Sequence, residues 1–160
     1  MTGQPALHPV IRPLGALDLD RAAALHAEAF VPFGERAWTR QDMAELLASP
    51  GVAGLLLEVD GADAGMAICR VAADEAELIT IAVRPAHRRR GVARQLLAAA
   101  VDHVRLAGAR SLFLEVAVDN PAALRLYELS GFCAAGNRPA YFRRGDGLAA
   151  DALVMRLDLA

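Results

Sequence analysis

The sequence has few aromatic residues, little charge and no long apolar run. Of its 160 residues, 5% are aromatic and 22% are charged, and the formal net charge is −2. No segment approaches the about 18 uninterrupted apolar residues of a membrane-spanning helix, and the N-terminal MTGQPALHPVIRP lacks the charged-then-apolar order of a signal peptide. We therefore expect a soluble, cytoplasmic protein without a membrane or nucleic-acid partner.

Cysteine and histidine are scarce too, and their spacing is not that of a metal or redox site. Cys69 and Cys133 stand alone in mostly apolar stretches, with no CxxC pair. Because free cysteine is among the most often buried residues, both are expected to be buried thiols. No metal site is expected either, since the four histidines lack metal-ligand spacing. These histidines are His8, His26, His87 and His103.

Length and periodicity indicate one α/β domain over residues 1–160, because 55% hydrophobic residues suffice for a single well-filled core. Strands are predicted at 8–14, 51–59, 64–72, 76–83, 111–118, 132–143 and 150–158, and helices at 17–30, 39–48, 91–107 and 121–130. The order β-α-α-β-β-β-α-β-α-β-β indicates an α/β sandwich with a sheet of mixed direction.

Several elements carry local predictions. Thr39 followed by Asp42 is typical of a helix N-terminus, and Asp60-Gly61 between two apolar stretches predicts a hairpin. The run 76–83 is almost continuously apolar, as expected for a strand covered on both faces. The first helix is expected to bury the stripe Leu19, Ala23 and His26 or Ala27, and the third the stripe Val92, Leu96, Ala100 and Val104.

The segment PAHRRRGVAR, residues 85–94, gathers positive charge where a strand passes into a helix. Such a turn leaves backbone amides unpaired at the positive end of the helix dipole, which attracts anions. Gly91 lets a bulky anion approach the main chain, and Ala93 continues the opening. The lysine and glycines of nucleotide-binding loops are missing, which disfavours an ATP site. Charge and dipole alone leave open a pyrophosphate site and a solvated basic surface.

The same segment carries a resemblance to a known family. IAVRPAHRRRGVARQLL resembles the acetyl-CoA signature of the GCN-five-related N-acetyltransferases (GNAT), R/Q-x-x-G-x-G/A, through Arg88, Gly91 and Ala93. LEVAVDNPAALRLYELSGF resembles the segment that follows the signature in that superfamily. The resemblance covers nearly the whole chain and is strongest from Glu77 to Phe132. Within the superfamily the chain most resembles the bacterial ribosomal-protein alanine N-acetyltransferases, through AFxP, AW and RPAYFRRGDGLAADALVM.

The resemblance implies a fold and a co-substrate. The fold is a GNAT-type mixed, largely antiparallel sheet of about six to seven strands flanked by about four helices. The co-substrate is acetyl-CoA, without a metal. The implied contacts to it are the backbone of Ile81, Ala82 and Val83 along the pantetheine arm, the amides of Arg89, Arg90, Gly91, Val92, Ala93 and Arg94 around the pyrophosphate, with Arg88 of the signature, and a contact from Asn120.

Two residues are implied to do the chemistry. Glu115 is the one charged residue of the strand SLFLEVAV, and the resemblance implies that it is the general base. Tyr127 matches the tyrosine that donates a proton to the departing CoA thiolate. An α-amine, with a pKa near about 7.7–8.0, is largely protonated at neutral pH and must lose protons to attack the thioester. The residues alone leave two other interpretations open. Glu115 could simply meet solvent or an arginine, and Tyr127 could be a core residue.

Asn120 precedes a proline, and this pair is interpreted first as a helix N-cap.

The remaining predictions concern the acceptor. The resemblance implies that Arg138 and Tyr141 line a peptide entrance, with Trp38 beside the groove. Phe142 stands where relatives often have a second tyrosine.

The leading hypothesis for the function is acetylation of the N-terminal alanine of a ribosomal protein. Transfer to a small amine such as an amino acid, polyamine or antibiotic is the alternative, and a CoA-binding regulatory module without turnover or a basic patch for RNA are further ones. The sequence does not indicate the oligomeric state.

Overall fold

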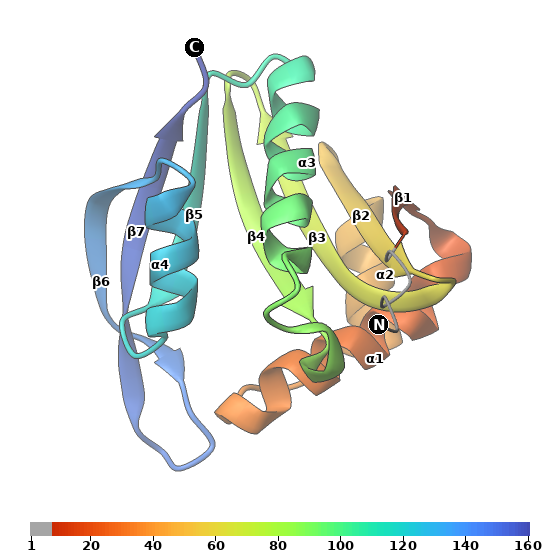
Figure 1. The fold of residues 1–160 in the computed structure, drawn as a ribbon. Helices are drawn as coiled ribbons and strands as arrows, with labels where there is room; N and C mark the ends of the chain where they lie inside the picture. Colours follow the sequence, from red (N-terminus) through yellow and green to blue (C-terminus); the bar gives the residue numbers. More distant parts are fainter. Residues whose placement is uncertain (1–7) are drawn as a thin grey trace, which may run out of the picture.

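A twisted β-sheet forms the middle of the molecule (Figure 1). The computed structural model describes residues 8–160, and its seven strands pair in the order β1-β2-β3-β4-β5-β7-β6. All pairs are antiparallel except β4 and β5, which are parallel. The strands are β1 (Pro9–Leu14), β2 (Val52–Val59), β3 (Ala62–Ala72), β4 (Glu75–Val83), β5 (Ser111–Ala117), β6 (Cys133–Arg143) and β7 (Ala149–Asp158). This agrees with the predicted fold class.

Helices cover both faces of this sheet. The α-helices are α1 (Leu19–Phe30), α2 (Arg40–Ala48), α3 (Val92–Leu106) and α4 (Pro121–Leu129), and short 3-10 turns stand at Ala16–Asp18, Val31–Phe33 and Pro85–His87. The α3 and α4 side chains share one core with β4 and β5, whereas α1 and α2 pack in a second core on the opposite face. Within residues 8–160, none of the helices has the length and apolar content to cross a membrane.

Helix α3 approaches the sheet closely at Gly65. A Cβ there would lie 2.8 Å from the Ala82 carbonyl oxygen and 2.9 Å from a methyl group of Leu96, so only glycine fits. The apolar stripe predicted for this helix is confirmed, since all four of its residues are buried. The helix therefore holds its N-terminus at a fixed place beside the end of β4.

Local signals in the sequence were reliable for helix ends. The Thr39 hydroxyl accepts the Asp42 N–H at 3.0 Å and the Asp42 carboxylate accepts the Thr39 N–H at 2.8 Å, which confirms the predicted start of α2.

In α1 the predicted stripe of buried residues is partly wrong. Ala23 and Ala27 are only half-buried, because the helix turns Ala22, Leu25 and Ala29 toward the core instead.

Two predictions about burial are wrong. The run 76–83 is covered on both faces only from Leu78 onward, since Glu77 is exposed, as is Glu75 before it. The core under α1 and α2 includes Ile79 and Ala82 of this strand and stops before the two glutamates. Cys69 is buried as predicted, but Cys133 is exposed because it begins β6, the strand at the edge of the sheet.

Candidate functional site

The two parallel strands in the middle of the sheet separate after a short paired stretch. Strands β4 and β5 pair only at Glu75–Ser111, Ala76–Leu112 and Glu77–Phe113. Beyond this point β4 stays paired with β3, and β5 stays paired with β7. Figure 1 shows the two strands diverging toward the end where α3 begins. The facing edges of both strands are therefore available to another molecule over residues 79–83 and 114–117.

The turn from β4 into α3 presents a row of backbone amides. Gly91, with φ of +76°, is the N-cap of α3, and the first amide paired within the helix is that of Gln95, bonded to the Gly91 carbonyl. In residues 8–160 the amides of residues 89–94 have no backbone acceptor. Six free N–H groups at the positive end of a helix form an anion site. These are the amides that the resemblance assigned to the pyrophosphate.

The arginines of this turn differ in orientation. Arg89, Arg90 and Arg94 are exposed, and none of them forms an ion pair within the described part of the chain. Arg88 instead turns toward the end of α1, where its guanidinium lies 5.8 Å over the Phe33 ring and donates to the Ala29 carbonyl at 3.5 Å. Three of the four predicted charges are thus exposed and unpaired within residues 8–160, on the same turn as the free amides.

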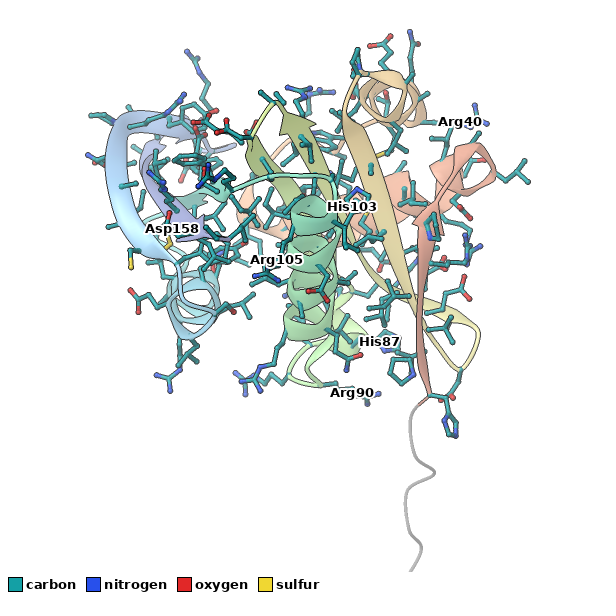
Figure 2. The ribbon with its side chains drawn as sticks, turned by 90° about the horizontal axis from the view of Figure 1, so that it is seen from above. Arg40, His87, Arg90, His103, Arg105 and Asp158 are labelled. Carbon is teal, nitrogen blue, oxygen red and sulfur yellow. The ribbon has the colours of Figure 1, made fainter. Side chains whose placement is uncertain are left out.

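A small cavity of about 90 Å³ adjoins this turn. His87 and Arg90 lie together beside the start of α3, while His103 is near the far end of the helix (Figure 2). The buried Nδ1 atom of His87 has no hydrogen-bond partner in residues 8–160. The cavity is lined by Pro9, Val59, His87, Arg90, Val92 and Gln95.

On the sheet face opposite α3, an open trough of about 310 Å³ follows the strands to the point where they separate. We call it the β4–β5 trough, and it is lined by Arg70, Ala72, Glu75, Ala76, Glu77, Phe113, Leu114, Glu115, Arg138 and Val154. Glu115, with its side chain 20% exposed, forms an ion pair with Arg138 at 3.0 Å. The alternative in which this carboxylate meets an arginine is therefore what the structure shows.

Strand β6 brings two further predicted residues to the same carboxylate. The Arg138 guanidinium lies 5.3 Å over the Tyr141 ring. A hydrogen bond with Glu115 raises the pKa of Tyr141. Glu115 is thus brought together with Arg138 and Tyr141, which follow it by more than twenty residues in the sequence.

Tyr127 and Asn120 belong to α4, on the opposite face of the sheet from the trough. Burial raises the pKa of Tyr127 to about 12, so the phenol keeps its proton at neutral pH. Its ring contacts Phe132 edge-on, with the centroids 5.8 Å apart. The side-chain oxygen of Asn120 accepts the Ala123 N–H at 3.2 Å, which confirms the predicted N-cap.

The structure does not bring Trp38 to the trough. Its indole stacks on His26 with ring centroids 4.3 Å apart, and its backbone N–H donates to Nδ1 of His26 at 3.2 Å. Burial, above all, lowers the pKa of His26 to about 4, so this imidazole is a neutral acceptor. Trp38 therefore packs between α1 and α2 instead of lining the trough.

Sequence reasoning missed two charged residues near the site. Glu77 lines the trough, and its signal was a carboxylate inside an otherwise apolar run. Arg144, only 13% exposed, forms ion pairs with Glu35 at 2.8 Å and with Asp119 at 2.7 Å. It had no sequence signal, because its partners come from distant loops.

These features suit group transfer from an anionic carrier. Within the described chain, no group of three or more histidine, cysteine or acidic side chains gathers as a metal would require. The free amides can hold a pyrophosphate, and the unpaired edges of β4 and β5 can take an extended arm. Glu115 and Tyr127 stand on opposite faces of the sheet, and a carboxylate and a phenol are groups that can accept and donate a proton.

Comparisons with known proteins agree with this chemistry. The model of the acetyltransferase (GNAT) family matches residues 20–132. The chain is 37% identical over 152 residues to N-alpha-acetyltransferase RimI of Mycobacterium tuberculosis, covering 91% of each chain. It is 40% identical over 104 residues to the ribosomal protein bS18-alanine N-acetyltransferase of Escherichia coli strain K12, covering 65% of this chain and 70% of that protein. A crystal structure of the ribosomal-protein-S18-alanine N-acetyltransferase from Escherichia coli matches with a TM-score of 0.86 at 33% identity, covering 96% of this chain and 95% of that chain.

Proposed function

Because the chain belongs to the acetyltransferase (GNAT) family, we propose that it acetylates the N-terminal α-amine of a ribosomal protein that begins with alanine. The chain is an acetyl-CoA-dependent N-acetyltransferase, and acetyl-CoA is its co-substrate. The acceptor is proposed from the similar proteins, which are named for an alanine of ribosomal protein S18. The observation that carries the proposal is the open β4–β5 trough, which leads along the sheet to Glu115.

Acetyl-CoA is proposed to bind from the turn to the gap between the strands. The amides of residues 89–94 hold the pyrophosphate, with Arg89, Arg90 and Arg94 around it. The pantetheine arm lies along Ile81, Ala82 and Val83, where β4 has lost β5 as a neighbour. Asn120 contacts CoA beside its cap. The signature residue Arg88 supports the turn by holding the end of α1.

The chemistry is a direct attack of the amine on the thioester. Glu115 accepts the proton that the nitrogen loses, either directly or through a water molecule. An N–H of the strand near Val83 stabilises the oxyanion of the tetrahedral intermediate. As the intermediate collapses, the C–S bond breaks and Tyr127 donates its proton to the CoA thiolate. The pKa of Tyr127, raised to about 12, keeps that proton in place until the thiolate forms.

Arg138 and Tyr141 are proposed to position the peptide. In the structure the guanidinium of Arg138 is paired with the Glu115 carboxylate, to which the incoming ammonium group would bind. The acceptor must therefore replace Arg138 at Glu115, since both carry a positive charge. Arg138 and Tyr141 both stand on β6, where the register with β7 shifts between Arg138 and Phe142.

A second candidate acceptor is a small cationic amine. The trough carries Glu75 and Glu77 as well as Glu115, and such a lining attracts positive charge. Against it stands the open shape of the trough, which has room for a chain that extends beyond the amine.

Mass spectrometry of an acceptor panel tests the proposal. Peptides that differ in their first three residues, free amino acids and polyamines are each incubated with the protein and acetyl-CoA. We expect a mass increase of one acetyl group on the α-amine of peptides that begin with alanine, and little on peptides that begin with a large residue. Acetylation of small amines without any peptide product would establish the second candidate in its place.

A further inference from the structure

Glu77 is an exposed carboxylate that has no ion-pair partner in residues 8–160. It stands on β4 and lines the β4–β5 trough. Across residues 8–160 it forms no ion pair within 4.0 Å, although Arg70 of β3 lies opposite it in the register. A solvated carboxylate next to a reaction centre is available to a charged group of the substrate.

Its place in the sheet fixes how far it lies from the reacting carboxylate. Glu77 pairs with Phe113 in the last rung before β4 and β5 separate, and Glu115 follows Phe113 by two residues on the same face. Strands about 4.8 Å apart and a rise of about 3.3 Å per residue put the Cα atoms of Glu77 and Glu115 at least roughly 8 Å apart. Glu77 therefore stands further along the trough than Glu115, beside the path of an acceptor whose amine lies at Glu115.

The charge balance of the trough adds a second reason. Its lining has three carboxylates, Glu75, Glu77 and Glu115, and two guanidiniums, Arg70 and Arg138. One guanidinium is already paired with Glu115. The part of the trough beyond Glu115 therefore has one guanidinium for two carboxylates, and it favours a cation.

We propose that Glu77 selects acceptor peptides that carry an arginine or lysine side chain at the second or third residue. This inference rests on the proposed acetylation of a protein N-terminus. Successive Cα atoms of a peptide are about 3.8 Å apart, so the second and third residues of a chain whose amine is at Glu115 come within side-chain reach of Glu77. A long cationic side chain then forms the ion pair that Glu77 lacks.

The test compares peptides that differ only in charge at one position. Hexapeptides beginning with alanine carry arginine, glutamine or glutamate at the second residue, and a matched set carries them at the third. kcat/KM is measured at low ionic strength with the wild-type protein, Glu77→Gln and Glu77→Arg. Glu128→Gln is the matched control, because this exposed glutamate of α4 is on the other face of the sheet.

We expect the wild-type protein to prefer the arginine peptide over the glutamate peptide about tenfold, which corresponds to about 1.4 kcal/mol. The preference should shrink in 0.5 M salt, nearly vanish in Glu77→Gln, reverse in Glu77→Arg and persist in Glu128→Gln. If Glu77→Arg does not fold, Glu77→Gln alone decides, with its melting temperature as the check.

Two results overturn the inference without touching the proposed function. One is an unchanged preference in Glu77→Gln, and the other is an equal loss of kcat/KM for all peptides in that variant. Failure of the wild-type protein to acetylate any peptide would overturn the proposed function itself.

Discussion

At the scale of single residues, the site depends on how the protein treats its ionisable groups. Glu115 is paired with an arginine from another strand, whereas Tyr127 is buried and its pKa is raised to about 12. The two groups differ in burial and in their partners, which suits the base and the acid that we propose for one reaction. The contribution of each group can therefore be tested by a separate substitution.

The Glu115→Gln substitution should lower kcat by roughly 100-fold or more, because the amide cannot accept the amine proton. The affinity for acetyl-CoA should stay nearly intact, since Glu115 lies on the face of the sheet opposite α3. Steady-state kinetics and calorimetry with acetyl-CoA measure the two quantities. Turnover at the wild-type rate would remove the base assignment.

His26 predicts how stability depends on pH. Its pKa is lowered from 6.5 to about 4, mainly by burial, so in this interval the unfolded chain binds a proton that the folded chain does not. The free energy of unfolding should therefore fall by up to about 3 kcal/mol as the pH drops from 6.5 to 4. Arg12 lowers the pKa of the Asp18 carboxylate to about 2, so Asp18 changes the free energy of unfolding only at more acidic pH.

Urea unfolding at pH 7.5 and pH 4.5 measures this dependence. His26→Phe keeps an aromatic ring beside Trp38 but cannot titrate, so its loss between the two pH values should be smaller. An equal loss in both proteins would show that other groups cause the acid destabilisation.

At the scale of elements, the link between β4 and α3 matters most. Gly91 has φ of +76°, a conformation in which other residues are strained. A Cβ at this position would meet only the Gln95 side chain, 4.0 Å away. A lack of space inside the protein is therefore not the reason for glycine here. The backbone angle is a reason, and the proposed approach of a pyrophosphate would be another.

Gly91→Glu should weaken acetyl-CoA binding by at least roughly 100-fold, because it adds a negative charge where the pyrophosphate is expected. Folding should lose only about 1 kcal/mol from the strained backbone. Gly91→Ala is the control, with the same strain and no charge, and it should bind far better. Titration calorimetry and melting temperatures separate the two effects, and intact binding by Gly91→Glu would contradict the loop assignment.

At the scale of the whole molecule, one arginine joins segments that are far apart in the sequence. Arg144, at the turn between β6 and β7, contacts Glu35 after α1 and Asp119 after β5. The same turn packs against Gly34, where a Cβ would lie 3.0 Å from the Gly145 nitrogen. Figure 1 shows this turn reaching toward the end of α1 across the gap between the strands.

Arg144→Gln should release this hairpin. We expect faster amide exchange over residues 138–150 and a loss of about 1–3 kcal/mol in the free energy of unfolding, since two carboxylates lose their partner. Arg143→Gln is the matched control, because Arg143 is exposed and forms no ion pair within the described residues. Exchange rates equal in the two variants would show that Arg144 does not hold the hairpin.

The order of the elements, the start of α2 at Thr39, the stripe of α3 and the Asn120 cap could all be predicted, because each depends on neighbours within one or two turns of the chain. Burial on α1 and β4 could not, since it depends on which part of the sheet a helix covers. Trp38 shows the same limit, because nothing near it in the sequence indicates that it stacks on His26.

The sequence by itself determined the strands and helices and the amides and arginines around Gly91, since short-range patterns carry that information. The residues proposed as base and acid came from the resemblance of the sequence to a family. Only the tertiary structure decided that β4 and β5 part after three rungs, that Arg138 occupies Glu115 and that Glu77 faces an open trough. These facts depend on the pairing of strands that are distant in the chain, and register between such strands has no local signature in the sequence.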